Sequence, residues 1–172
     1  IVYEIIMEGD KFTNTSMSIK ALLGLIEAND IAIPEIQRPF VWKNAQVRDL
    51  MDSLYKGFPT GYIILWKNPN VKLKDGTISS GKKVVIDGQQ RITAMMTAIA
   101  ARKVFNSDFQ QTRVKIAFNP EAALEYEKDN DEAEIFAVQT PAHLKSKNWI
   151  ADIAEIFDSQ FASYSFIPQY IE

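Results

Sequence analysis

The sequence contains no cysteine and only one histidine, His143. The absence of cysteine excludes disulfides, thiolate metal sites and cysteine nucleophiles. One histidine cannot build a zinc site that needs several histidine ligands. The apolar runs are shorter than the roughly 18 residues of a membrane span, and no signal peptide is visible. We therefore expect a cytoplasmic protein with no membrane partner.

Basic residues are also too few to coat the surface. The 172 residues carry a net charge of −3, with 47% apolar and 24% charged residues. Strong nonspecific nucleic-acid binding by the whole domain is therefore not expected, although a local basic patch stays open. The length predicts a single domain over residues 1–172. Because the sequence starts at Ile1 and ends at Glu172 without a clear signal, we expect a fragment of a longer protein.

Apolar spacing predicts four helices. The first is capped by Ser16 or Ser18 and ends at Asn29-Asp30, and the second is capped by Asn44 and stopped by Gly57. A third follows Asp87-Gly88, and residues 148–157 have the spacing of a fourth. The predicted inner face of the third helix consists of Ile92, Met95, Met96 and Ile99.

Strand patterns lie between these helices. Residues 62–66 and 82–86 are predicted to pair, and residues 112–119 and 134–138 read as further strands. The prolines of residues 34–39 exclude a helix there and favour an extended segment. The pattern predicts an α+β fold with one small mixed sheet and helices packed on it.

The loop between the paired strands contains GTISSGKK, residues 76–83, which approaches a phosphate-loop motif. Lys83 stands where a magnesium-binding Ser or Thr is needed, and the motif leads into a strand instead of a helix. We therefore interpret it as a hairpin loop. Its lysines could contact the phosphates of DNA or be merely solvated, and both readings stay open: Lys72, Lys74, Lys82 and Lys83.

The junction VVIDGQQRITAMM, residues 84–96, has the features of an anion site. The first N–H groups of a helix are unpaired and carry partial positive charge. Gly88 allows a ligand to approach the backbone, Gln89 and Gln90 offer amide donors, and Arg91 can form a forked pair with phosphate. Asp87 would cap the helix, bind Mg²⁺ or orient a water. The alternative is an ordinary capped turn in which Arg91 pairs with a surface acid.

A second polar feature lies upstream in IPEIQRPFVW, residues 33–42. Gln37 and Arg38 sit between two prolines on a segment that should be rigid. Phe40 and Trp42 either stack on a base or pack in the core, and Arg38 either meets phosphate or forms a salt bridge.

These two signatures, in this order and spacing, resemble the N-terminal domain of GmrSD-type restriction endonucleases, which are modification-dependent systems that cleave foreign DNA. The resemblance covers roughly residues 18–102, and NWIADIAEIF at 148–157 also resembles the family. That domain is in turn similar to the ParB/sulfiredoxin fold, in which two corresponding elements form a nucleoside-triphosphate pocket. Sulfiredoxin chemistry does not carry over, because it needs a cysteine.

The resemblance implies a site for a nucleoside triphosphate with Mg²⁺ at the start of the third helix. The implied nucleotide-binding residues are Gln37, Arg38, Gly88, Gln89, Gln90, Arg91 and Thr93. Those implied to act in hydrolysis are Asp87, Gln90 and Arg91, and no residue is expected to form a metal site of its own.

The implied function is a nucleotide-binding, hydrolysing regulatory domain of an anti-phage restriction protein. DNA would be met through the full-length protein, whose C-terminal nuclease domain has a His-Asn-His type site. His143 stands alone, so we expect it to cap or pack and expect no nuclease activity from these residues. The alternative is a DNA-binding module of the same fold without turnover, in which the lysine-rich loop and Arg48 contact phosphates.

Overall fold

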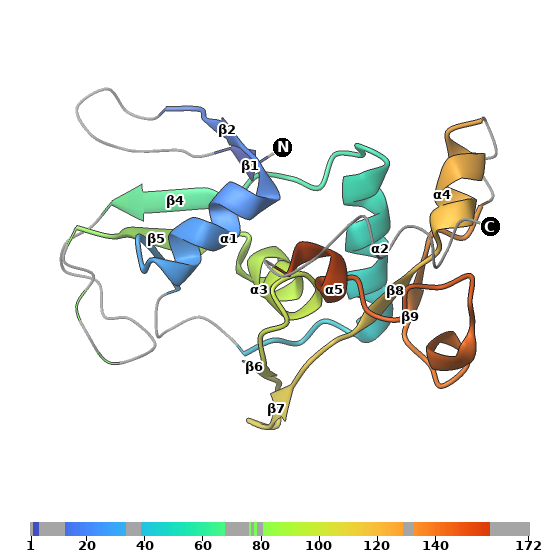
Figure 1. The fold of residues 1–172 in the computed structure, drawn as a ribbon. Helices are drawn as coiled ribbons and strands as arrows, with labels where there is room; N and C mark the ends of the chain where they lie inside the picture. Colours follow the sequence, from blue (N-terminus) through green and yellow to red (C-terminus); the bar gives the residue numbers. More distant parts are fainter. Residues whose placement is uncertain are drawn as a thin grey trace. The chain divides into compact units, whose positions relative to one another are not determined.

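The computed structural model has the predicted α+β fold, with small sheets and several helices (Figure 1). Two compact units can be separated: residues 1–41 with 59–93, and residues 42–58 with 94–172. Helix α3 (Gln89–Ala98) begins in the first unit and ends in the second. The residues that the structure describes are 2–3, 13–33, 39–67, 76, 78, 81–128 and 133–158.

The first unit is built around a three-stranded sheet in the order β3-β5-β4. β3 (Ile31–Ala32) runs parallel to β5 (Lys83–Asp87), while β4 (Ile64–Lys67) is antiparallel to β5. The sheet is therefore mixed, as predicted. Both predicted strands are shifted toward higher numbers, and the pairing of β4 is irregular between Ile64 and Leu65. A separate ribbon pairs β1 (Val2–Tyr3) with β2 (Ser16–Met17).

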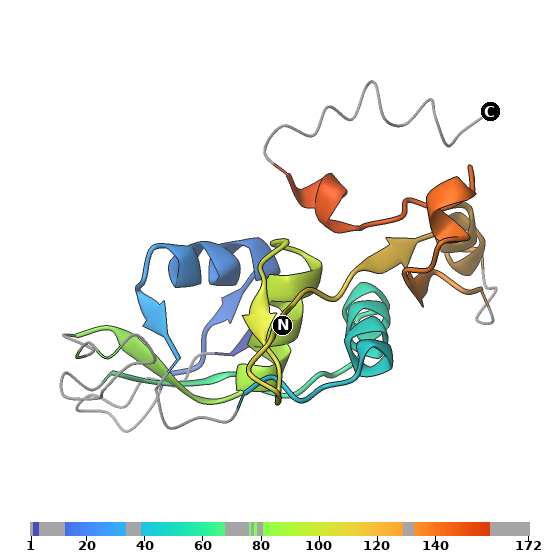
Figure 2. The same cartoon turned by 90° about the horizontal axis from the view of Figure 1, so that it is seen from below.

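Helix α1 (Ile19–Glu27) lies along one face of this sheet (Figures 1 and 2). Ser18 caps it, because the Ser18 hydroxyl accepts a hydrogen bond of 3.1 Å from the Ala21 amide. Leu22 and Leu23 are its buried residues. The choice left open between Ser16 and Ser18 therefore falls on Ser18, since Ser16 lies in β2.

In the second unit, helix α2 (Asn44–Tyr55) starts one residue earlier than predicted. Asn44 is its first residue and not its cap, a position that Lys43 takes. The Gln46 side-chain oxygen reaches back to accept from the Lys43 amide at 2.8 Å, which stabilises the helix start without Asn44. Gly57 ends the helix region with a φ of 72°, as predicted.

The remaining strands pair into two ribbons and do not join the central sheet, so the expectation of one sheet is wrong for the described residues. β6 (Val104–Phe105) pairs with β7 (Gln111–Thr112), and β8 (Ile116–Phe118) pairs with β9 (Phe136–Val138), both antiparallel. The single strand predicted over 112–119 is thus divided between two ribbons. Helix α4 (Pro120–Tyr126) connects β8 toward β9.

The predicted helix over 148–157 shortens to α5 (Ala154–Phe157), which follows the 3-10 helix η1 (His143–Lys145). Ile150 instead exchanges two backbone hydrogen bonds with Phe118, and the Ile153 amide donates to the Ile116 carbonyl. The buried Asp152 carboxylate pairs with Arg113 at 2.7 Å and caps Ala154 at 3.2 Å. These contacts hold residues 150–153 against β8 and delay the helix. No helix in the described part of the chain is long and apolar enough to cross a membrane.

Candidate functional site

The candidate site lies in the first unit, where β5 turns into α3. Gly88 connects the two elements with a φ of 92°, and its carbonyl accepts the first helical hydrogen bond from Ile92 at 2.9 Å. Gly88 therefore occupies the cap position, and the expectation that Asp87 caps the helix is wrong. Asp87 is the last residue of β5, and its carboxylate is turned to Arg91.

Gly88 is also closely packed against the residue that precedes β4. A Cβ added at Gly88 would lie 2.9 Å from Cγ1 and 3.3 Å from Cα of Ile63, which is itself buried. The first distance is shorter than real Cβ contacts, and the second would require Ile63 to move by a few tenths of an ångström. The positive φ disfavours a side chain independently. Glycine is thus required here by packing against Ile63 as well as by backbone conformation.

Gln90 connects α3 to the last part of the upstream signature IPEIQRPFVW. Its side-chain oxygen accepts from the Val41 amide at 3.0 Å, and its side-chain nitrogen donates to the Pro39 carbonyl at 3.1 Å. The side-chain amide of Gln90 thus makes the pair of hydrogen bonds with residues 39–41 that the backbone of a neighbouring strand would make. The two sequence signatures are brought into direct contact by this one side chain.

Arg91 is held by two oxygens from the same unit. Its Nη1 donates to the Thr60 carbonyl at 2.5 Å, and its Nη2 donates to Asp87 Oδ2 at 2.9 Å. A Cβ at Gly61 would overlap the Arg91 guanidinium, so Gly61 leaves the space that this arrangement needs. Arg91 thus has the ion pair with a surface acid that the ordinary-turn alternative expected, and the acid is Asp87, four residues earlier. The Asp87 cap of that alternative is absent, because Gly88 takes the cap position.

Helix α3 is buried around most of its circumference, and not along one stripe only. Of the predicted inner face, Ile92, Met95 and Ile99 are buried and Met96 is half-buried. Gln89, Gln90 and Thr93 are buried as well, Gln89 and Gln90 with 8% of their surface exposed. Buried polar side chains need hydrogen-bond partners, in the protein or in a ligand. The unusual feature of this helix is thus its polar first turn.

The upstream signature is described in part. Gln37 and Arg38 lie outside the described residues. Phe40 is buried in the core, which confirms the packing interpretation for its ring, and Trp42 is half-buried. The contacts of Pro39 and Val41 with Gln90 were not predicted, because nothing in the spacing shows which backbone a buried glutamine will meet.

Only two of the four lysines proposed for DNA contact belong to the described part of the chain. Lys72 and Lys74 lie outside the described residues. Lys82 and Lys83 line a cavity of about 490 Å³ together with the end of α1 and the start of β3. This cavity lies at the beginning of β5, whereas Asp87 and Gly88 lie at its end. The lysines and the candidate site therefore occupy opposite ends of one strand.

Within the described residues, no group of three or more His, Asp or Glu could hold a metal ion by itself. His143 has the packing role that was expected. Its ring lies 4.7 Å from that of Trp149, and its Nδ1 accepts from the Thr140 amide at 3.0 Å.

The fold and this junction define a class: a small α+β domain with a polar, glycine-led helix start at the end of a mixed sheet. Residues 19–171 match the family model described as the N-terminal domain of GmrSD restriction endonuclease. The chain belongs to this family.

A relative is the uncharacterized protein MJ0686 of Methanocaldococcus jannaschii, which is 28% identical over 49% of this chain. The match covers 17% of the relative's length, so the chain corresponds to a small part of that protein. No solved structure matches the chain.

Proposed function

We propose that this chain is a nucleoside-triphosphate-binding and hydrolysing regulatory domain of a DNA restriction protein. The phosphates lie at the start of α3, and the nucleotide state controls a nuclease domain elsewhere in the full-length protein. The pocket is of the ParB-like type that the resemblance implies, with the DGQQR signature as one wall and the proline-braced segment as the other.

One observation carries this proposal: the bidentate contact of Gln90 with Pro39 and Val41. Gln37 and Arg38 immediately precede Pro39 in the sequence, and the resemblance implies that they belong to the same pocket. A pocket made from two separate signatures requires such a connection. Gln90 thus serves first as the positioning residue of the pocket.

The electrostatics of the helix start favour an anion. The N–H groups at the start of a helix carry partial positive charge, and Gly88 has no side chain to block the approach to them. Arg91 has five N–H donors, and the contacts with Thr60 and Asp87 fix the plane of its guanidinium. A phosphate oxygen would meet an arginine that is already oriented, which lowers the entropy lost on binding.

Asp87 fits the role of magnesium ligand. Magnesium usually binds nucleotide phosphates together with one or two protein carboxylates and several waters, so a three-residue metal cluster is not needed. The Asp87 carboxylate is exposed, and its Oδ2 is the atom paired with Arg91. Bound Mg²⁺ supplies charge neutralisation at the phosphates. The side chains would contribute position: Arg91 and Gln89 would orient the phosphate chain, and Asp87 would orient the water that attacks the terminal phosphorus. The bond from that phosphorus to the bridging oxygen would break, so that nucleoside diphosphate and inorganic phosphate leave.

The test is to titrate each nucleoside triphosphate with Mg²⁺ into the chain by calorimetry and to follow phosphate release. We expect binding by the wild type and a loss of about tenfold to a hundredfold in Arg91→Ala, since hydrogen bonds to charged groups contribute about 1.5–3 kcal/mol. If the wild type neither binds a nucleotide nor releases phosphate, the proposal is wrong.

Arg48→Ala is the matched control. Arg48 also pairs with a carboxylate, that of Asp49 at 2.6 Å, but it lies on α2 in the other unit. Its removal should leave nucleotide affinity unchanged. Equal losses in both variants would indicate a nonspecific effect of net charge.

A DNA-binding module without turnover is the second candidate. Phosphate release separates the two, because a pure DNA-binding module releases none at any nucleotide concentration.

A further inference from the structure

The ribbon of β6 and β7, labelled in Figure 1, belongs to the second unit. It carries two exposed phenylalanines. Phe105 is 56% exposed on β6, and Phe109 is 77% exposed in the connecting turn. Phe109 is the most exposed of the large apolar residues in the described part of the chain. Burying such rings is strongly favourable, so their exposure asks for an explanation outside the packing of the unit.

The turn that carries Phe109 is held by hydrogen bonds to Asn106. The Asn106 side-chain oxygen accepts from the amides of Asp108 and Gln110, at 3.0 and 2.9 Å. The backbone of Asn106 pairs with Phe109 and Gln110, each at 3.0 Å. These four hydrogen bonds define the conformation of the turn that carries the Phe109 ring.

That conformation is unfavourable for phenylalanine. Phe109 has a φ of 57°, in the left-handed region where this type of hairpin usually places glycine. A bulky residue there is a backbone outlier that local structure does not favour, and such outliers concentrate at functional positions. Neither backbone preference nor burial accounts for a phenylalanine at residue 109.

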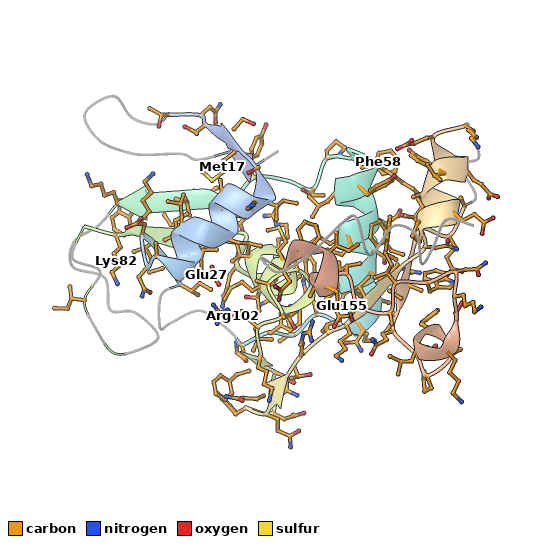
Figure 3. The ribbon with its side chains drawn as sticks, in the orientation of Figure 1. Met17, Glu27, Phe58, Lys82, Arg102 and Glu155 are labelled. Atoms are coloured by element: carbon orange, nitrogen blue, oxygen red, sulfur yellow. The ribbon has the colours of Figure 1, made fainter. Side chains whose placement is uncertain are left out.

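The base of the hairpin is basic, in contrast with the acidic chain as a whole. Residues 101–113 contain Arg102, Lys103 and Arg113 against the single acid Asp108, while the net charge of the chain is −3. Arg102 and Lys103 are exposed where β6 begins (Figure 3 labels Arg102). Arg113 is bound to the buried Asp152 and anchors the other strand of the ribbon.

We propose that this hairpin binds single-stranded DNA, with Phe105 and Phe109 stacked on unpaired bases and Arg102 and Lys103 beside the phosphates. Aromatic rings interleaved with cations are the combination by which proteins hold unpaired nucleotides without reading their sequence. An apolar protein partner would satisfy the rings but not the flanking cations, so charge favours nucleic acid. The choice of DNA over RNA rests on the proposed restriction function, whereas the hairpin and the nucleotide pocket are independent sites in different units.

The test uses the whole chain without nucleotide and a short fluorescein-labelled single-stranded DNA of mixed sequence, followed by anisotropy at low salt. We expect Phe109→Gly to weaken binding about tenfold, which is the scale of one lost base–aromatic stack. This variant relieves the backbone at residue 109, so it should fold at least as well as the wild type. Lys103→Ala should lower the salt slope by about one.

Phe58→Ala is the matched control for Phe105→Ala. Phe58 is the same residue type with the same exposed fraction, 56%, and lies in the same unit after α2. We expect Phe105→Ala to weaken DNA binding and Phe58→Ala to leave it unchanged.

The proposal would be overturned if the wild type did not bind single-stranded DNA, if wild type and Phe109→Gly bound it equally, or if the Phe105 and Phe58 variants showed equal losses. Self-association that Phe109→Gly abolishes, without DNA binding, would assign the hairpin to a contact between copies and also overturn it. A chain that binds nucleotide through Arg91 but not DNA contradicts only the hairpin proposal, and the reverse result contradicts only the nucleotide proposal.

Discussion

The first turn of α3 and the tip of the β6–β7 hairpin both depart from the usual burial of side chains, in opposite directions. At the helix start, Gln89 and Gln90 are buried, whereas at the hairpin Phe105 and Phe109 are exposed. Glutamine is mostly found at the surface of proteins, and phenylalanine mostly inside. Both regions therefore reverse the usual partition, and the reason differs between them.

The buried Gln90 has an internal explanation. Its amide makes two hydrogen bonds with Pro39 and Val41, so the cost of burying it is offset within the chain. For the exposed Phe109, neither its φ of 57° nor its packing offers a comparable explanation. A buried polar residue can thus position the backbone around a site, whereas an exposed aromatic residue in a strained turn indicates a surface that binds a partner.

The largest expected change in stability comes from a substitution at the start of α3. Gly88→Ala should lower the free energy of unfolding by about 2–4 kcal/mol, because it combines an unfavourable positive φ with overpacking against Ile63. Urea unfolding measures this change. Gly24→Ala is the control: Gly24 lies inside α1 with no atom near its added Cβ, so alanine should stabilise by about 0.5–1 kcal/mol. Effects of the same sign would contradict the role of Gly88.

Gln90→Ala removes the two hydrogen bonds of the buried Gln90 amide, so the Val41 amide and the Pro39 carbonyl lose their partner. The free energy of unfolding should fall by about 1–3 kcal/mol. Hydrogen exchange at the Val41 amide should accelerate in this variant, which locates the loss. Gln110→Ala, at an exposed position, should change stability by less than about 0.5 kcal/mol. Unchanged exchange at Val41 would mean that Gln90 does not hold the segment.

Phe109→Gly should have the smallest effect and the opposite sign, a gain of about 1 kcal/mol, because glycine adopts a positive φ without steric cost. Phe109→Ala loses the same ring but keeps a side chain that disfavours the positive φ. The difference in stability between the two variants therefore measures the cost of the backbone conformation at residue 109. Thermal unfolding of both measures it. If glycine is no more stable than alanine at residue 109, the conformation is not strained and the contrast between the two regions weakens.

Local features of the fold were predictable from the sequence because they depend on neighbouring residues. Ser18 caps α1 through a hydroxyl three residues before the amide that it binds, and Gly57 ends α2 through its own backbone freedom. The predicted start of α2 was one residue too late, because asparagine is a strongly preferred capping residue. In the structure the Lys43 amide instead donates to the side-chain oxygen of Gln46.

Features that depend on distant contacts were not predictable. The contact between Gln90 and Val41 spans 49 residues, and no periodicity in the sequence indicates it. The strand predicted over 112–119 is divided because its two ends pair with different partners, β6 and β9. The positive φ of Phe109 was missed because the turn contains no glycine to signal it. The candidate nucleotide residues were found by pattern, but only the structure describes how Gln90 and Arg91 are held.

The parallel pairing of β3 with β5 has a consequence for the order of events in folding. Ile31 pairs with Lys83, so the long intervening chain must close before β5 is supported on this side. Closing a long loop is slow, because its entropy is lost before the contacts form. Helix α3 can form early from local hydrogen bonds, but its entry through Gly88 waits for the sheet. We therefore expect the helix start to acquire its final shape among the last parts of the first unit, and a ligand bound there to act mainly by slowing unfolding.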